Sequence, residues 1–282
     1  MTRSVGLFVL TSVAGSLLGQ VVPERAGKAP LSADEQAAAL NAVREYARTY
    51  TASLPNYTCI QSTRQLLTRP AALAGGPIGR PSRIDLIEEQ LSVVNGRELR
   101  TLTRINERRP SDAERTAIGT LSHGEFANLL DTIFDPRNGA DIRWERAASL
   151  DGHRVYLFAY QVPQQRGYTL VGPSGNTRVP FEGVVYADSR TGAVLRIEMK
   201  CTGIPRESGY RTVALTLDYK PARVADREFL LPARFSMRYE MNSGGAIIGA
   251  EYKSYKRFSA DSTIRFGDDA PSQRTPDSPE GR

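Results

Sequence analysis

The residue types that most often carry enzyme chemistry are few in this chain and stand apart from one another. There are two histidines, His123 and His153, and neither has a second metal-ligating residue at helical or hairpin spacing. A metal centre or a general base needs such a partner within reach. We therefore expect both histidines to be surface or turn residues, and the sequence predicts no metal site and no bound cofactor.

Two further patterns match catalytic motifs only in part. Gly172-Pro173-Ser174-Gly175 is shorter by one residue than the Gly-x-Ser-x-Gly turn of serine hydrolases, and no helix is predicted after it. Glu88 and Glu89 are adjacent in a predicted strand, so their side chains point to opposite faces and cannot act as a carboxylate pair. The sequence also lacks Walker, Rossmann and zinc signatures. We therefore expect a protein without a catalytic centre.

The two cysteines, Cys59 and Cys201, are candidates for a disulfide. In an oxidising compartment a lone pair of cysteines often forms one. Because the loop between them is long, the bond would stabilise the fold by about 4 to 5 kcal/mol on the chain-entropy model. Two buried free thiols are the alternative, and the sequence leaves both open.

Apolar side chains that repeat on one face of a predicted element indicate a different kind of site. Two predicted strands carry aromatic residues or methionine at alternate positions, and a predicted helix offers a facing apolar stripe. Such residues are typical of adaptable ligand cavities, and equally of an ordinary core. The candidate ligand contacts are Leu40, Val43, Ala47, Tyr156, Phe158, Tyr160, Phe235, Met237, Tyr239 and Met241.

Some of these side chains lie on predicted helices, and the sequence indicates where the helices begin and end. The first is predicted over residues 32–54, because Ser32 and Glu35 form a capping box and the residue before Pro55 is pushed away from helical angles. A second helical region is predicted over residues 112–133. The two apolar helix faces need a common partner, which the rest of the chain must supply.

Most of the remaining chain alternates apolar and polar residues, as antiparallel strands with one buried face do. Asn95-Gly96 and Asp151-Gly152 predict tight hairpins, and Val155–Tyr160 is apolar on both faces, so we expect a strand that is covered on both sides. Residues 32–266 are therefore predicted to form one α+β domain. Its core would be a strongly curved antiparallel sheet, an open or half β-barrel of about ten or eleven strands, in meander order over two helical segments.

The N-terminus is typical of a secretory signal peptide. Arg3 precedes an uncharged apolar run over residues 5–18, which is shorter than the ~20 residues that a membrane-spanning helix needs. We expect cleavage after Gly19, a lead-in over residues 20–31 and a disordered tail over residues 267–282. No cysteine near the cut could accept a lipid anchor. The mature chain is thus predicted to be periplasmic or secreted, without a transmembrane segment.

The chain carries a net charge of +6, and its arginines are spread along the sequence. A solvated basic surface is the simpler interpretation, and attraction to anionic lipid headgroups is the alternative. Nucleic acid is not an expected partner, because export removes the usual opportunity and no nucleic-acid motif is present.

This order of elements resembles the LolA-like periplasmic lipoprotein-carrier superfamily, which includes lipoprotein-sorting proteins and mycobacterial lipid carriers. The resemblance lies in the leader, the helix that runs into Tyr57-Thr58-Cys59, the hairpin segments 156–160 and 181–197, and the segment Asp226–Pro232. It implies an eleven-strand half barrel with helices in its mouth and an apolar cavity for acyl chains. The implied partners are an acyl lipid or a lipoprotein. The alternative is an envelope protein–protein interaction module with a filled core.

The leader can be tested by mass. Because the basic start and the apolar run are those of a cleaved signal peptide, we expect protein exported by a secreting bacterium to begin between residues 17 and 27. Intact-mass spectrometry of the exported protein measures this directly. Retention of Met1 on the exported protein would show that the leader is not removed.

Overall fold

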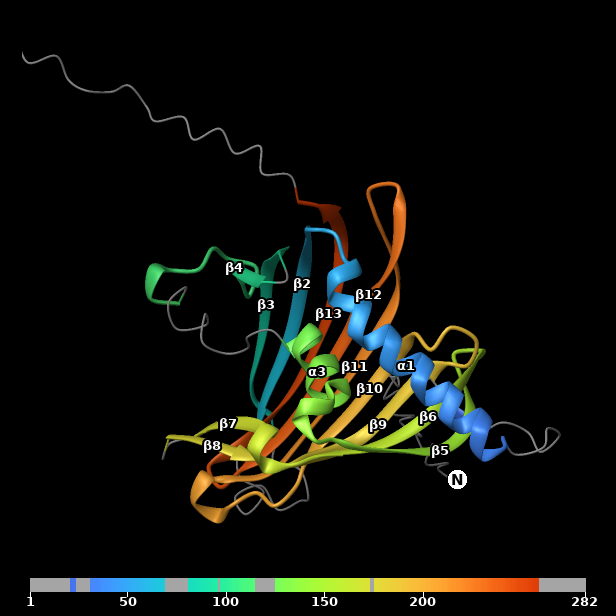
Figure 1. Cartoon of the computed structure of the whole chain (residues 1–282). Coiled ribbons are helices and arrows are strands. Elements are labelled where there is room, and N and C mark those ends of the chain that lie inside the picture. The colour runs from blue at the N-terminus through green and yellow to red at the C-terminus, as the bar shows by residue number, and fades with distance from the viewer. Residues whose placement is uncertain are drawn as a thin grey trace, which may run out of the picture.

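The computed structural model describes residues 21–23, 31–68, 81–95, 97–114, 125–172 and 175–258. They form an eleven-stranded antiparallel sheet that curves around two helices, α1 and α3, so the predicted fold class is confirmed (Figure 1). The helices are α1 (Ala33–Ser53) and α3 (Glu125–Phe134), with 3-10 turns η2 (Pro136–Asn138), η3 (Gln164–Arg166) and η4 (Arg206–Ser208). The strands of the large sheet are β1 (Val21–Pro23), β2 (Tyr57–Thr68), β3 (Pro81–Val94), β4 (Arg97–Ile105), β5 (Asp141–Leu150), β6 (His153–Val162), β9 (Phe181–Asp188), β10 (Val194–Cys201), β11 (Tyr210–Val224), β12 (Arg227–Met241) and β13 (Gly244–Arg257).

The strand order departs from a simple meander at three places, where β1 pairs with β5, β6 with β9 and β13 with β2. Within the sheet the order is β1-β5-β6-β9-β10-β11-β12-β13-β2-β3-β4, so β13 pairs with β2 and the early strands lie beside the last one. Both helices lie between strands from opposite ends of this order: α1 follows β1 and precedes β2, and α3 follows β4 and precedes β5, the neighbour of edge strand β1 (Figure 1). The sheet stays open between its edge strands β1 and β4.

Helix α1 begins and ends where the sequence predicts. The Ser32 hydroxyl accepts a hydrogen bond from the Glu35 amide at 3.3 Å, and the Glu35 carboxylate accepts one from the Ser32 amide at 2.7 Å. These bonds complete the capping box and lower the pKa of Glu35. The second predicted helical region is only partly described: α3 forms its end, and residues 115–124 lie outside the described part of the chain.

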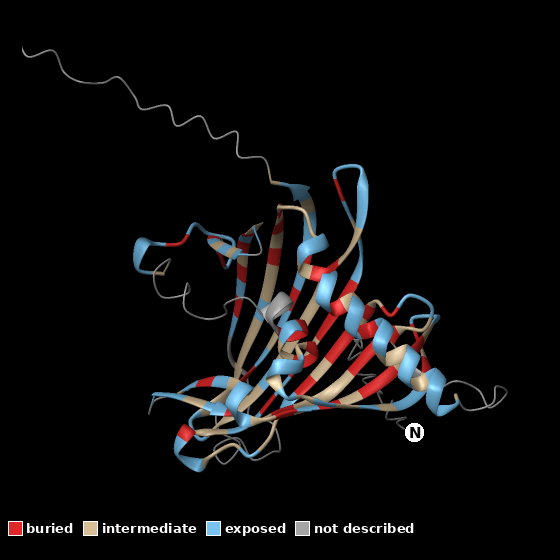
Figure 2. Cartoon of the chain, in the orientation of Figure 1, coloured by how far each residue is buried: buried red, intermediate tan, exposed pale blue. Residues whose placement is uncertain are grey.

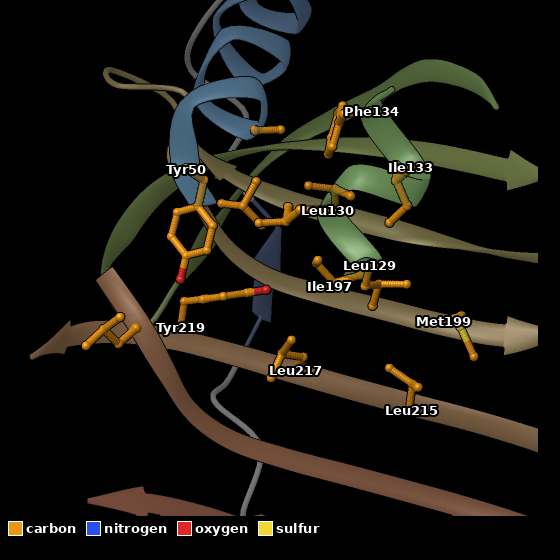
Figure 3. Close-up of a cluster of buried hydrophobic side chains, with 14 of the residues drawn as sticks. Tyr50, Leu129, Leu130, Ile133, Phe134, Ile197, Met199, Leu215, Leu217 and Tyr219 are labelled. Carbon is orange, nitrogen blue, oxygen red and sulfur yellow. The ribbon is translucent and has the colours of Figure 1, made fainter. Parts of the chain in front are cut away.

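The main core lies between the helices and the concave face of the sheet. Leu130 and Ile133 of α3 pack beside α1 and above Ile197 of β10, and all three are at most 1% exposed (Figure 3). Figure 3 also shows Leu215 and Leu217 of β11 pointing toward this cluster. The apolar stripe on each helix thus meets the same sheet face, as the sequence predicts.

Strand β6 is covered on both sides, which confirms the prediction from its uniformly apolar sequence. Phe158 faces the helix side, whereas Val155 and Leu157 belong to a separate cluster that includes Tyr186. Beside this second cluster the Arg196 guanidinium donates a hydrogen bond to the buried Asp218 carboxylate at 2.6 Å. The pair satisfies two charges that would otherwise be buried alone.

A small hairpin closes one end of the concave face. The sequence did not predict this cover. It consists of β7 (Tyr168–Gly172) and β8 (Gly175–Val179), which pair only with each other. Leu170 and Val179 pack against Val213 of β11. The signal in the sequence is weak because each of these strands has five residues.

The turn between β9 and β10 supports α1, and a pair of glycine substitutions tests this contact. Gly192 has a φ of 72°, and an added Cβ would lie 2.7 Å from the Ala42 backbone carbon. Gly152 has a φ of 84° but open space around it. Replacing either with alanine costs about 1 to 2 kcal/mol for the left-handed backbone, and Gly192→Ala should cost about 1 to 3 kcal/mol more because α1 must move.

Urea unfolding of Gly192→Ala and Gly152→Ala measures the difference. Equal losses of unfolding free energy in the two variants would show that α1 does not rest on this turn.

Candidate functional site

The register of the strands decides which side chains face the helices. Leu215 and Leu217 of β11 contact the helix-side cluster, and their partners on β12 are Met237 and Phe235. Paired residues of neighbouring strands point to the same side of a sheet. On β13 the next partner of Met237 is Ile248, so one apolar surface runs from beneath the helices onto β12 and β13.

The residues predicted to contact a ligand line two parts of the concave face, one filled by packed side chains and one half-open to solvent. Val43, Ala47, Phe158 and Tyr160 are at most 2% exposed and form part of the packed core. Half-buried Leu40 and Tyr156 pack against that core. The four candidates on β12, by contrast, are all half-buried; they are Phe235, Met237, Tyr239 and Met241. Figure 2 shows buried residues concentrated on the strands beneath α1 and α3.

The half-open part is apolar and aromatic. Phe235 and Met237 touch the main core from its margin, and Met237 also contacts the cluster beneath the β7–β8 hairpin. The ring of Tyr239 lies 5.8 Å from that of Tyr210, nearly edge to face. Met241 ends the strand opposite Tyr210. This margin therefore keeps apolar surface in contact with solvent, where further burial is favourable.

A group of tyrosines borders the same surface beneath α1, and the sequence analysis did not assign it a role. The rings of Tyr46 and Tyr50 are 5.5 Å apart, and Tyr50 meets Tyr219 of β11 edge to face at 5.9 Å. The Tyr50 hydroxyl donates to the Leu230 carbonyl at 2.9 Å. Burial raises the pKa of Tyr46, Tyr50 and Tyr219, so all three stay neutral hydrogen-bond donors.

One hydroxyl of this group has no protein partner. The Tyr46 oxygen is buried and makes no hydrogen bond within the described part of the chain. Leaving a buried donor unsatisfied costs about 1 to 3 kcal/mol. The spacing of Tyr46 and Tyr50, one helical turn apart, is the signal that could have identified the pair from the sequence.

The concave face becomes polar on the early strands. Cys59 and Leu91 belong to the core, and their register partner on β4 is Arg100, which therefore faces the same side. The Arg100 guanidinium lies 2.5 Å from the Glu98 carboxylate and 3.6 Å from that of Glu89. Burial raises the pKa of Glu89. Because two carboxylates share one guanidinium, this region does not attract an anionic group.

The two acidic neighbours Glu88 and Glu89 point to opposite faces, as predicted. Glu89 is 8% exposed on the concave side, whereas Glu88 lies 4.0 Å from Arg104 on the outer side. A bulge between these residues keeps Leu102 of β4 opposite Glu89.

Of the two alternatives for the cysteines, the structure shows the free thiols and no disulfide. Cys59 and Cys201 are free thiols, one buried and one half-buried. They lie on β2 and β10, which are separated by β11, β12 and β13. Neighbouring strands are ~4.8 Å apart. A distance of several strands is therefore far beyond the ~7 Å between Cα atoms that a disulfide can bridge. The spacing of cysteines along the chain cannot reveal this, because strand order decides it.

The motifs that suggested chemistry do not converge. His153 is exposed at the start of β6, while His123 and the central residues of the segment 172–175 lie outside the described chain. Among the described residues there is no group of histidine, cysteine and carboxylate side chains that could hold a metal ion. Neither α1 nor any other described helix combines the length and the apolarity of a membrane span.

No family model and no curated protein matches the chain. Among solved structures it is similar to a LolA superfamily protein from Nitrosomonas europaea, with 11% identity, a TM-score of 0.40 and coverage of 78% of this chain and 93% of that one. A putative outer membrane lipoprotein-sorting protein domain from Vibrio parahaemolyticus is 12% identical with a TM-score of 0.42, covering 78% of this chain and 92% of that one. The lipoprotein LppX from Mycobacterium tuberculosis is 10% identical with a TM-score of 0.28, covering 81% of this chain and 98% of that one.

Two of these descriptions name lipoprotein sorting or the superfamily that the sequence pattern resembles. Every one of these TM-scores is below 0.5, so the likeness carries no argument for a ligand. The fold class rests on the eleven-stranded sheet itself, and the choice of function rests on its concave face.

The free thiols give a test with a defined pH dependence. Burial raises the pKa of Cys59 and of Cys201 to about 12. Since only the thiolate reacts, the alkylation rate of the native protein should still rise by about tenfold per pH unit between pH 7 and 9. Titration of the unfolded, unreduced protein should find two thiols.

If the unfolded, unreduced protein contained no free thiols, Cys59 and Cys201 would have to form a disulfide after all. A rate that levels off near pH 9 would show that the thiols are not shielded as described.

Proposed function

We propose that this chain is an exported, non-catalytic protein that binds an apolar or acylated ligand, such as a lipid or the acyl chains of a lipoprotein, on the concave face of its sheet. The observation that carries the proposal is the half-open margin on β12, where Phe235 and Met237 remain half-buried beside a filled core. An acyl chain laid on this margin would remove that apolar surface from water at about 25 cal/mol per Å².

The arrangement of side chains also suggests how such a ligand would lie. Its apolar part would contact Phe235, Met237 and Ile248, which are neighbours across β12 and β13. The Tyr46 hydroxyl is buried without a hydrogen-bond partner in the described chain, so it could donate to an ester or amide carbonyl only after α1 moves aside. This combination of an apolar wall and few polar groups is typical of small-molecule sites.

One observation favours a second function, an envelope protein–protein interaction module. The part of the concave face under α1 and α3 is already filled, since Val43, Ala47 and Phe158 are at most 2% exposed. If the helices do not move, no ligand reaches that part. Only the ligand-binding function requires that the β12 margin contact a ligand, so changes at this margin distinguish the two functions.

Two adjacent isoleucines of β13 provide a matched test. Ile248 pairs with Met237 on the concave side, whereas Ile247 points to the opposite face and is 38% exposed. Ile248→Trp should fill the margin and weaken the binding of a fluorescent fatty acyl ester by about tenfold or more, while Ile247→Trp should leave affinity unchanged within about twofold.

Fluorescence titration gives the affinities, and urea unfolding shows that both variants fold. If the wild-type protein binds no acyl ester at micromolar concentration, or if both variants bind as the wild type does, the ligand-binding proposal fails and the interaction module is favoured.

A further inference from the structure

Most large apolar side chains of the described chain are buried, and three of the exposed ones lie together on the convex face. Ile84 and Leu86 of β3 are 47% and 46% exposed, and Ile247 of β13 is 38% exposed. Leu66 of β2 stands between them, since it pairs with Ile84 on one side and with Ile247 on the other. We call Leu66, Ile84, Leu86 and Ile247 the convex patch.

The register shows that the convex patch faces away from the helices. Cys59 of β2 and Leu91 of β3 belong to the helix-side core, and they are an odd number of residues from Leu66 and Leu86. Successive side chains of a strand point to opposite faces, so the patch lies on the outer side. Ala246, the neighbour of Ile247, is 2% exposed on the inner side. A ligand on the concave face would therefore leave the patch uncovered.

An unpaired cation lies within the convex patch. Arg64 pairs in register with Leu86 and with Gly249, and it is exposed without an ion-pair partner in the described chain. Gly249 has open space where a side chain would stand, so the guanidinium is not hindered from that side. The nearby Arg238 is already paired with Glu240 at 2.7 Å. The nearest carboxylates on this face, Glu88 and Glu251, are paired with Arg104 at 4.0 Å and Arg234 at 3.6 Å. The patch thus combines aliphatic side chains with the positive charge of Arg64.

We propose that the convex patch docks the protein on the surface of an anionic lipid bilayer. The aliphatic side chains would enter the headgroup boundary, and Arg64 would bind a lipid phosphate, with support from the net charge of +6. A symmetric contact between two copies of the chain fits less well. It would bring two patches together and bury two Arg64 side chains in one apolar interface.

Vesicle sedimentation tests the proposal with the full exported chain. Binding to vesicles of phosphatidylglycerol and phosphatidylcholine should exceed binding to phosphatidylcholine alone and should fall with added salt. Ile84→Ser/Leu86→Ser and Arg64→Glu should each weaken binding to the anionic vesicles by about tenfold or more.

The matched controls are Leu99→Ser and Arg97→Glu, which change exposed residues of β4 outside the convex patch. Binding by both controls should match that of the wild type. Ile248→Trp should also retain vesicle binding, which separates this proposal from ligand binding on the concave face.

Three outcomes would overturn the docking proposal: no preference for anionic vesicles, equal losses in patch and control variants, or a dimer in sedimentation velocity that only the patch variants dissociate. The third would assign the patch to a second copy of the chain.

Discussion

The structure depends on one constraint: two helices must cover the concave face of a much larger sheet. Helix α1 buries Val43, Ala47 and Tyr50, and α3 buries Leu130 and Ile133. These side chains are enough to fill the space above β6, β9, β10 and β11. They do not cover the middle of β12, where Phe235 and Met237 stay half-buried, although Ala250 and Tyr252 of β13 are buried in the same core. The half-buried margin therefore arises because the two helices are too small to cover the whole concave face of the sheet.

The two faces of the sheet consequently have different roles in our proposals. On the concave side, Phe235 and Met237 are half-buried, so an apolar ligand could bury more of their surface. On the convex side, Ile84 and Leu86 are exposed beside the free charge of Arg64. Because strand alternation fixes which residues share a face, a substitution at one position can test one side without changing the other.

The local elements could be predicted because their signals lie within a few residues. Ser32 and Glu35 mark the start of α1, and the left-handed turn residues Asn95 and Asp151 mark hairpins with φ values of 51° and 50°. The double-sided burial of β6 follows from its unbroken apolar sequence. Each of these features is decided by neighbouring residues and elementary backbone preferences.

Features that depend on contacts between distant strands could not be predicted. Pairing of β13 with β2 separates Cys59 from Cys201 and brings Arg64 beside Gly249. Nothing near these residues in the sequence encodes that neighbourhood. The group formed by Arg100, Glu89 and Glu98 also needs the register of β3 and β4, including its bulge. For the candidate site, the sequence suggested which apolar residues could contact a ligand, but not that the structure divides them into a filled and a half-open part.

Photo-crosslinking with an acyl ester that carries a diazirine near its chain end tests the central claim most directly. If the ligand lies on the β12 margin, peptide mapping should locate the adducts on Phe235, Met237 and Ile248, which share the concave face. Excess unlabelled ester should compete them away. Adducts confined to the convex residues Ile84 and Leu86, or no competed adduct on β12 or β13, would contradict ligand binding on the concave face.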